Sequence, residues 1–134
     1  MIGVLIVTHG DIGTSLLTSA NQILGGEQKQ VATLSVWRAD EIDDLVLRAR
    51  ELIDGLDAGD GVLVLTDIFG ATPGNVVSRL LEDGRIEGVS GASLPMLLRV
   101  LTSRNGSLAE LVRDELGERG ERLLGVGTFG LEQD

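Results

Sequence analysis

The chain has 134 residues, of which 43% are hydrophobic and 24% charged, values typical of one globular domain with a sizeable core. Its formal net charge of −10 and its 11 scattered lysines and arginines exclude the basic face that a nucleic-acid-binding protein needs. We therefore expect a basic protein surface as partner, although the acidity fits a role in solubility equally well.

The chain contains no cysteine and a single histidine, which excludes disulfides and thiol catalysis and argues against a metal site. No apolar run approaches the roughly 18 residues of a membrane span. Met1 leads directly into the run IGVLIV without a basic leader or a cleavage site. We therefore expect no signal peptide and a cytoplasmic protein.

The first half of the chain alternates apolar runs with helical patterns. The run MIGVLIV (1–7) lacks polar alternation, which predicts a strand buried on both faces, as in a parallel sheet. Apolar residues at helical spacing then predict a helix from Ile12 until the glycine pair at 25–26. A second strand is expected over 31–36, and Asp40 is expected to cap the long helix that follows.

The second half repeats this alternation with shorter elements. A third buried strand is expected over 61–66, followed by a helix with Thr72 as N-cap and Pro73 as its first residue, closed by Gly84. The remaining predicted elements are a weaker strand over 87–92, a helix from Pro95 to Leu101, a helix capped by Ser107 and Glu110 that ends near Leu116, and a strand over 122–127.

Strands and helices alternate along the chain without a linker or a repeat. This pattern predicts an α/β fold, a doubly wound, mainly parallel sheet with helices on both faces, formed by residues 1–134 as one domain. We expect the first strand between the second and the third, which corresponds to the order 2-1-3-4. The last strand lacks a following helix, so we expect it at the edge of the sheet, in antiparallel orientation.

Polar residues follow the first and third predicted strands, where ligands of open α/β sheets bind. His9, the single histidine, ends the first run, and Asp67 ends the third. If these strands are neighbours, the two side chains lie side by side. The carboxylate then accepts a hydrogen bond from one ring nitrogen and leaves the other nitrogen as a nucleophile. Gly10 and Gly70 are the glycines that we expect at special backbone angles.

The loop after Asp67 points to a phosphoryl group as the species that His9 handles. Gly70, Ala71 and Thr72 lead into a predicted helix start, where free N–H groups and a hydroxyl collect. Phosphoryl transfer asks a protein mainly for positioning and charge stabilisation. Neither a G-x-x-x-x-G-K-[ST] loop nor a G-x-G-x-x-G fingerprint follows the first strand, so we expect no nucleotide or other cofactor.

Structural roles for the same residues remain open at this point. A histidine at a strand end can be a solvated surface residue, and Asp67 can simply cap the turn that follows it. Thr72 and Pro73 form a good helix start whatever the function. A serine triad has no support, because Ser15 and Ser19 are separated from His9 by helical geometry.

Three segments together resemble the enzyme IIA component of the mannose-type phosphoenolpyruvate-dependent sugar phosphotransferase system. They are VTHGDIG (7–13), LTDIFGATPGN (65–75) and SLPMLL (93–98), and the resemblance is weakest after about Arg104. It implies that His9 accepts a phosphoryl group, that Asp67 orients the ring, and that Thr72 stands beside the phosphate. It also implies a homodimer whose last strands are exchanged.

The resemblance implies partners as well. The phosphoryl group would come from the histidine-containing phosphocarrier protein and pass to a separate IIB protein, with the membrane involved only through the permease. The chain departs from the family pattern at Gly70-Ala71, where two glycines are usual, and at Ser93, which replaces a usual asparagine. The alternative is a regulatory phosphoprotein, or a subunit of a dihydroxyacetone-kinase phosphorelay, whose His9 phosphorylation is read by a partner without sugar transport.

Overall fold

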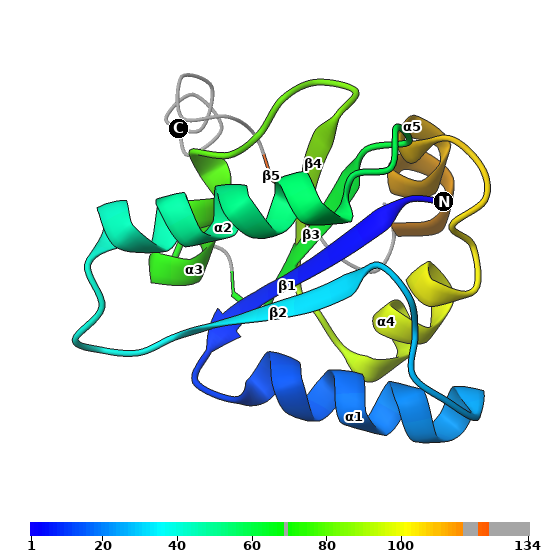
Figure 1. The fold of residues 1–134 in the computed structure, drawn as a ribbon, viewed down its shortest axis with the longest axis horizontal. Coiled ribbons are helices and arrows are strands. Elements are labelled where there is room, and N and C mark those ends of the chain that lie inside the picture. Colours follow the sequence, from blue (N-terminus) through cyan, green and yellow to red (C-terminus); the bar gives the residue numbers. More distant parts are fainter. Residues whose placement is uncertain (69, 117–120, 124–134) are drawn as a thin grey trace.

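The computed structural model describes residues 1–68, 70–116 and 121–123, and its centre is a five-stranded sheet (Figure 1). In sheet order the strands are β2 (Val31–Val36), β1 (Gly3–His9), β3 (Val62–Thr66), β4 (Ile86–Ser90) and β5 (Glu121–Leu123). Strands β1 to β4 are parallel, and β5 pairs antiparallel with β4. The predicted order 2-1-3-4 is confirmed. Residues 124–127 of the predicted last strand lie outside the described residues.

Helices cover both faces of the sheet, as the doubly wound prediction requires (Figure 1). One face carries α2 (Ile42–Leu56) and α3 (Thr72–Ser78). The other face carries α1 (Ile12–Leu24), α4 (Leu94–Leu101), the short α5 (Leu108–Glu110) and the π-helical segment η1 (Leu111–Leu116). Among the described helices, none is both long and apolar enough to cross a bilayer.

The central strand shows why the apolar runs lack alternation. In β1, Leu5 and Val7 belong to the core beneath α2 and α3, whereas Val4 and Ile6 belong to the core beneath α1 and α4. All four side chains are buried. Successive residues of a strand point to opposite faces, so a strand covered on both faces must be apolar at every position.

Two predicted helix caps are wrong. Asp40 does not cap α2, because its carboxylate accepts a hydrogen bond from the backbone N–H of Trp37 at 2.8 Å, and the helix begins after Glu41. Thr72 is the first residue of α3 rather than its N-cap, which is Ala71, and the side chain of this alanine makes no capping hydrogen bond. Ser107 does accept a hydrogen bond from the N–H of Glu110, as its predicted capping role requires.

Helix α3 is shorter than predicted and ends at Ser78 instead of continuing to Gly84. The N–H groups of Arg79 and Leu80 bond to the carbonyl groups of Val76 and Val77, three residues back. Such bonds tighten the last turn and end the helix. Leu80 nevertheless stays buried in the core, so its apolar character reflects packing rather than helix length.

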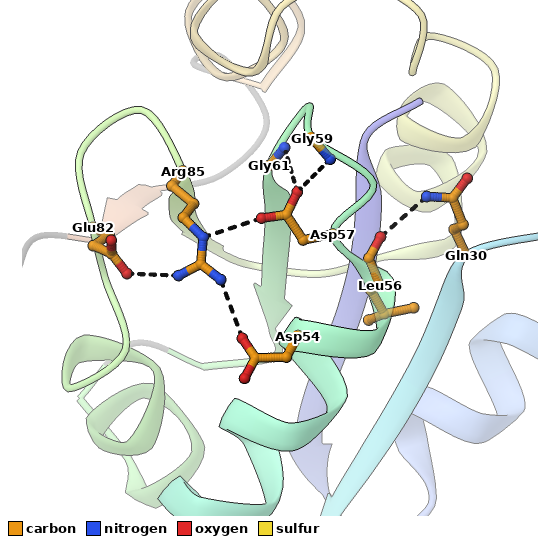
Figure 2. Close-up of polar contacts among 8 residues, drawn as sticks. All are labelled: Gln30, Asp54, Leu56, Asp57, Gly59, Gly61, Glu82 and Arg85. Carbon is orange, nitrogen blue, oxygen red and sulfur yellow. Dashed lines mark hydrogen bonds and ion pairs between the residues drawn. The ribbon is translucent and has the colours of Figure 1, made fainter.

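A polar network joins the elements at the amino ends of β3 and β4 (Figure 2). The guanidinium of Arg85 bonds to Asp54 at the end of α2, to Asp57 and to Glu82 at 2.8–3.1 Å. The N–H group of Gly59 also donates to Asp57, and this bond is the main cause that lowers the pKa of that carboxyl. The network stabilises the end of the sheet opposite His9.

Candidate functional site

His9 is the last residue of β1, and the chain turns sharply directly after it. Its register partner in β2 is Val36, whose carbonyl accepts a hydrogen bond from the N–H of Gly10 at 2.9 Å. Gly10 has a φ of 50° and Gly70 a φ of 82°, the left-handed values expected for both. The turn therefore holds the imidazole at the carboxyl edge of the sheet.

The start of α1 adds a second restraint on the turn. The hydroxyl of Thr8, itself buried, accepts a hydrogen bond from the N–H of Gly13 at 2.8 Å. This bond satisfies one of the first-turn donors that a helix leaves without an intrahelical acceptor. Asp11, at the N-cap position, makes no capping bond with its side chain. Strand and helix are thus tied together on either side of His9.

His9 and Asp67 lie side by side, as the adjacency of β1 and β3 predicts. The Nδ1 atom of His9 lies 2.9 Å from Oδ2 of Asp67, and the backbone N–H of His9 donates to the same oxygen at 3.2 Å. A carboxylate only accepts hydrogen bonds, so this geometry favours the tautomer with the proton on Nδ1. The side chain of Asp67 is 8% exposed and that of His9 46%, which leaves the ring accessible.

A cavity of about 670 Å³ opens beside the imidazole. Its lining residues are His9, Val36, Trp37, Arg38, Asp40, Glu41, Ile42, Asp43 and Thr72. The structure therefore brings His9 and Thr72 to one cavity. Of the other predicted phosphate-loop residues, Gly70 and Ala71 adjoin Thr72 in the chain but do not belong to the described lining.

The family model described as the PTS system fructose IIA component (EIIA-man) matches residues 3–116, which include all of these lining residues. The chain belongs to this family. It is thus a IIA component of the mannose type, as its three sequence segments suggested, and IIA components are phosphotransferase proteins.

Individual relatives agree with this membership. The chain is 34% identical over 105 residues to the fructose-specific EIIA component of Bacillus subtilis, covering 78% of this chain and 71% of that protein. It is 33% identical to the mannose-specific EIIAB component of Escherichia coli K12, over 92% of this chain but only 39% of that longer protein. An EIIA crystal structure from Streptococcus agalactiae superposes with a TM-score of 0.73 at 30% identity, covering 84% and 87% of the two chains.

Sequence reasoning missed the part of this IIA site that follows β2. Trp37 and Arg38 line the cavity, and Trp37 lies against Gly10. The connection from β2 to α2 runs past the carboxyl end of β1 (Figure 1). The predicted strand order contained the signal, because residues that follow a strand beside β1 must emerge at the same edge as His9.

One ring nitrogen of His9 stays available for group transfer. Among the described residues, no group of three or more His, Asp or Glu side chains is placed to hold a metal ion. The bond between His9 and Asp67 leaves Nε2 as the ring nitrogen without a hydrogen bond to the described residues. That nitrogen retains its lone pair and can act as a nucleophile.

Proposed function

We propose that His9 of this IIA component accepts a phosphoryl group from the histidine-containing phosphocarrier protein and passes it to a IIB protein during sugar uptake. The observation that carries the proposal is the 2.9 Å contact between Nδ1 of His9 and Oδ2 of Asp67. The sugar-specific names of the relatives from Bacillus subtilis and Escherichia coli favour transport over a purely regulatory role.

The transfer uses the lone pair of Nε2 in His9. It forms a bond to phosphorus while the bond from phosphorus to the donor histidine breaks, and the electron pair of that bond returns to the donor ring. The imidazole of His9 gains positive charge as its lone pair is shared. Asp67 holds the proton on Nδ1 and stabilises that charge. In the second transfer a nucleophile of the IIB protein bonds to phosphorus, the bond from phosphorus to Nε2 breaks, and its electron pair returns to the ring of His9.

The phosphoryl oxygens require donors around His9. Thr72 lines the cavity and offers a hydroxyl, while Gly70 and Ala71 bring the chain into the first turn of α3. Backbone N–H groups of a first helical turn lack intrahelical acceptors. We propose that the loops after β1 and β3 bind the phosphoryl group through Gly10, Gly70, Ala71 and Thr72. Asp67 and His9 are the proposed catalytic residues.

We propose that residues 1–134 act as one phosphocarrier unit in the cytoplasm, as a homodimer. The permease that the relay serves would be its only link to the membrane. The net charge of −10 supports electrostatic attraction of a basic partner surface.

The decisive experiment is incubation with phosphoenolpyruvate, enzyme I and the phosphocarrier protein, followed by intact mass measurement. We expect the mass of one added phosphoryl group, bound in an acid-labile and alkali-stable form, as a phosphoramidate is. The variant His9→Ala should gain no mass, and its circular dichroism serves as the folding control. Undiminished labelling of His9→Ala would exclude His9 as the acceptor.

A further inference from the structure

Arg38 occupies a distinctive place in the cavity beside His9. It follows Trp37 in the connection from β2 to α2 and lines the cavity together with His9 and Thr72. The other charged lining residues besides His9 are Asp40, Glu41 and Asp43, so Arg38 is the one lysine or arginine in the described lining. A positive charge therefore faces the same space as the accessible imidazole.

The backbone that carries Arg38 is held from both sides. Asp40 accepts a hydrogen bond from the N–H of Trp37 at 2.8 Å, and its own N–H donates to the carbonyl of Trp37 at 3.0 Å. Just before this turn, Val36 is paired with His9 across the two parallel strands. Consequently the position of the Arg38 backbone relative to His9 is set by β-sheet pairing and by a closed turn.

The guanidinium of Arg38 differs from those of Arg79 and Arg85, which form ion pairs. Arg85 bonds to three carboxylates, and Arg79 bonds to Asp43 at 3.1 Å. Arg38, by contrast, forms no hydrogen bond or ion pair with any residue that the structure describes. A free guanidinium offers a planar set of donors that matches phosphate oxygens in bidentate fashion.

The acidic lining of the cavity would repel an anionic ligand unless a cation offsets its charge. Asp43 forms an ion pair with Arg79, whereas Asp40 and Glu41 form none with the described residues and keep their negative charges at the cavity wall. A dianionic phosphoryl group on Nε2 of His9 would meet like charges there. Arg38 is the residue of the described lining that can offset this repulsion directly.

From this arrangement we infer that Arg38 binds the phosphoryl oxygens on phosphorylated His9 from the side opposite the α3 loop. The inference rests on the proposed phosphorylation of His9 and assigns a further phosphoryl-binding residue to that site. Arg38 acts as a cation that stabilises the dianionic form. Thr72 supplies a hydroxyl, and Asp67 keeps its contact with Nδ1.

The test compares Arg38→Ala and Arg38→Lys with Arg48→Ala. Arg48 is a matched control, since it is an exposed arginine of α2 that borders a neighbouring groove with Asp40 and Glu41 but does not line the His9 cavity. Each protein is phosphorylated, separated from the donor and titrated by ³¹P NMR. The readout is the pH midpoint at which the dianionic phosphoryl group takes up one proton and becomes the monoanion.

We expect Arg38→Ala to raise this midpoint by about 0.5–1 pH unit. The shift is smaller than the roughly 1–3 units caused by a charge pair sheltered from water, because the cavity is open to solvent. The protonated form, which is the one that hydrolyses readily, would then be about three- to tenfold more populated above the midpoint. The lifetime of the isolated phosphoprotein should shorten accordingly. Arg38→Lys keeps the charge but loses the planar set of donors, so its midpoint should lie between those of the wild type and Arg38→Ala. Arg48→Ala should equal the wild type.

Three outcomes are distinguishable. Equal midpoints and lifetimes in labelled wild type, Arg38→Ala and Arg48→Ala would overturn the role of Arg38 and leave the proposed function standing. Equal shifts in Arg38→Ala and Arg48→Ala would indicate a general effect of net charge and would also overturn it. A wild-type protein that takes up no phosphoryl group would overturn the proposed function, and this inference with it.

Discussion

The indole ring of Trp37 lies against Gly10, so closely that a Cβ atom at position 10 would stand 3.2 Å from the ring. Gly10 also has a φ of 50°, a value that is costly for residues with a Cβ atom. Both constraints meet directly beside His9. The glycine therefore permits the turn after β1 and the approach of the Trp37 loop at the same time.

Gly10→Ala should lower the free energy of unfolding by about 1–2 kcal/mol, because the alanine is strained in the left-handed region. It should also slow phosphorylation, since any relaxation moves His9. Adding Trp37→Ala should recover only the part due to the ring contact. Chemical denaturation measures both effects, with Gly26→Ala as the control because a Cβ there meets nothing within 4 Å. Equal losses at positions 10 and 26 would contradict this reading.

Asp67→Ala and Asp67→Asn should slow phosphoryl acceptance by roughly 10²–10⁴-fold while the fold is kept, because Asp67 fixes the ring proton on Nδ1. The asparagine preserves shape but loses the charge that stabilises the phosphorylated ring. Rates of transfer from the phosphocarrier and circular dichroism provide the measurement, and Asp83→Ala serves as an exposed control. Rates within a factor of about two of wild type would remove Asp67 from the site.

Thr72→Ala should leave the free energy of unfolding within about 0.5 kcal/mol of wild type, because Thr72 makes no capping bond in α3. Phosphoryl handling should nevertheless change, and Thr72→Ser should restore it, since the proposed contact with the phosphoryl group uses the hydroxyl that both residues carry. The measurement is a thermal melt of each variant, followed by timing of phosphoryl loss and transfer. If Thr72→Ala handles the phosphoryl group as the wild type does, Thr72 has no role in phosphate binding.

Asp57→Asn should destabilise the protein at neutral pH by about 1 kcal/mol and progressively less in acid. The folded state lowers the pKa of Asp57 through the Gly59 N–H, with further contributions from Gly61 and Arg85. A lowered pKa means that the stabilisation is fully present above the ordinary aspartate value of about 3.9 and is lost as the pH falls through the folded-state value. Urea unfolding of both proteins from pH 7 down to about pH 3, below the ordinary aspartate pKa, measures how the difference in the free energy of unfolding depends on pH. A difference that stays constant with pH would contradict the linkage.

The full-length chain should sediment as a homodimer at micromolar concentration. Strand β5 pairs with β4 in the structure, and the same antiparallel register can form with the β4 of a second copy. Truncation after Gly120 removes β5 and exposes the edge of β4, so we expect monomers or aggregates. A full-length protein that sediments as a monomer would rule out the exchanged dimer.

Much of this protein follows from its sequence alone. The unbroken apolar runs at β1 and β3 identify strands buried on both faces, and the helical stripe that ends at Gly25 identifies α1. These signals are local, because side-chain periodicity and backbone preferences act within a few residues. The pairing of His9 with Asp67 could also be expected, since parallel neighbours place their carboxyl ends at one edge.

The tertiary structure decided where the connection after β2 lies and what it does. Asp40 has the residue type of a helix cap, yet its carboxylate closes a turn with Trp37, and this turn brings Arg38 to the His9 cavity. The choice depends on the register that pairs Val36 with His9, a contact between residues far apart in the sequence. Local preferences of a few tenths to about 1 kcal/mol cannot determine such a choice when packing and strand pairing act on the same residues.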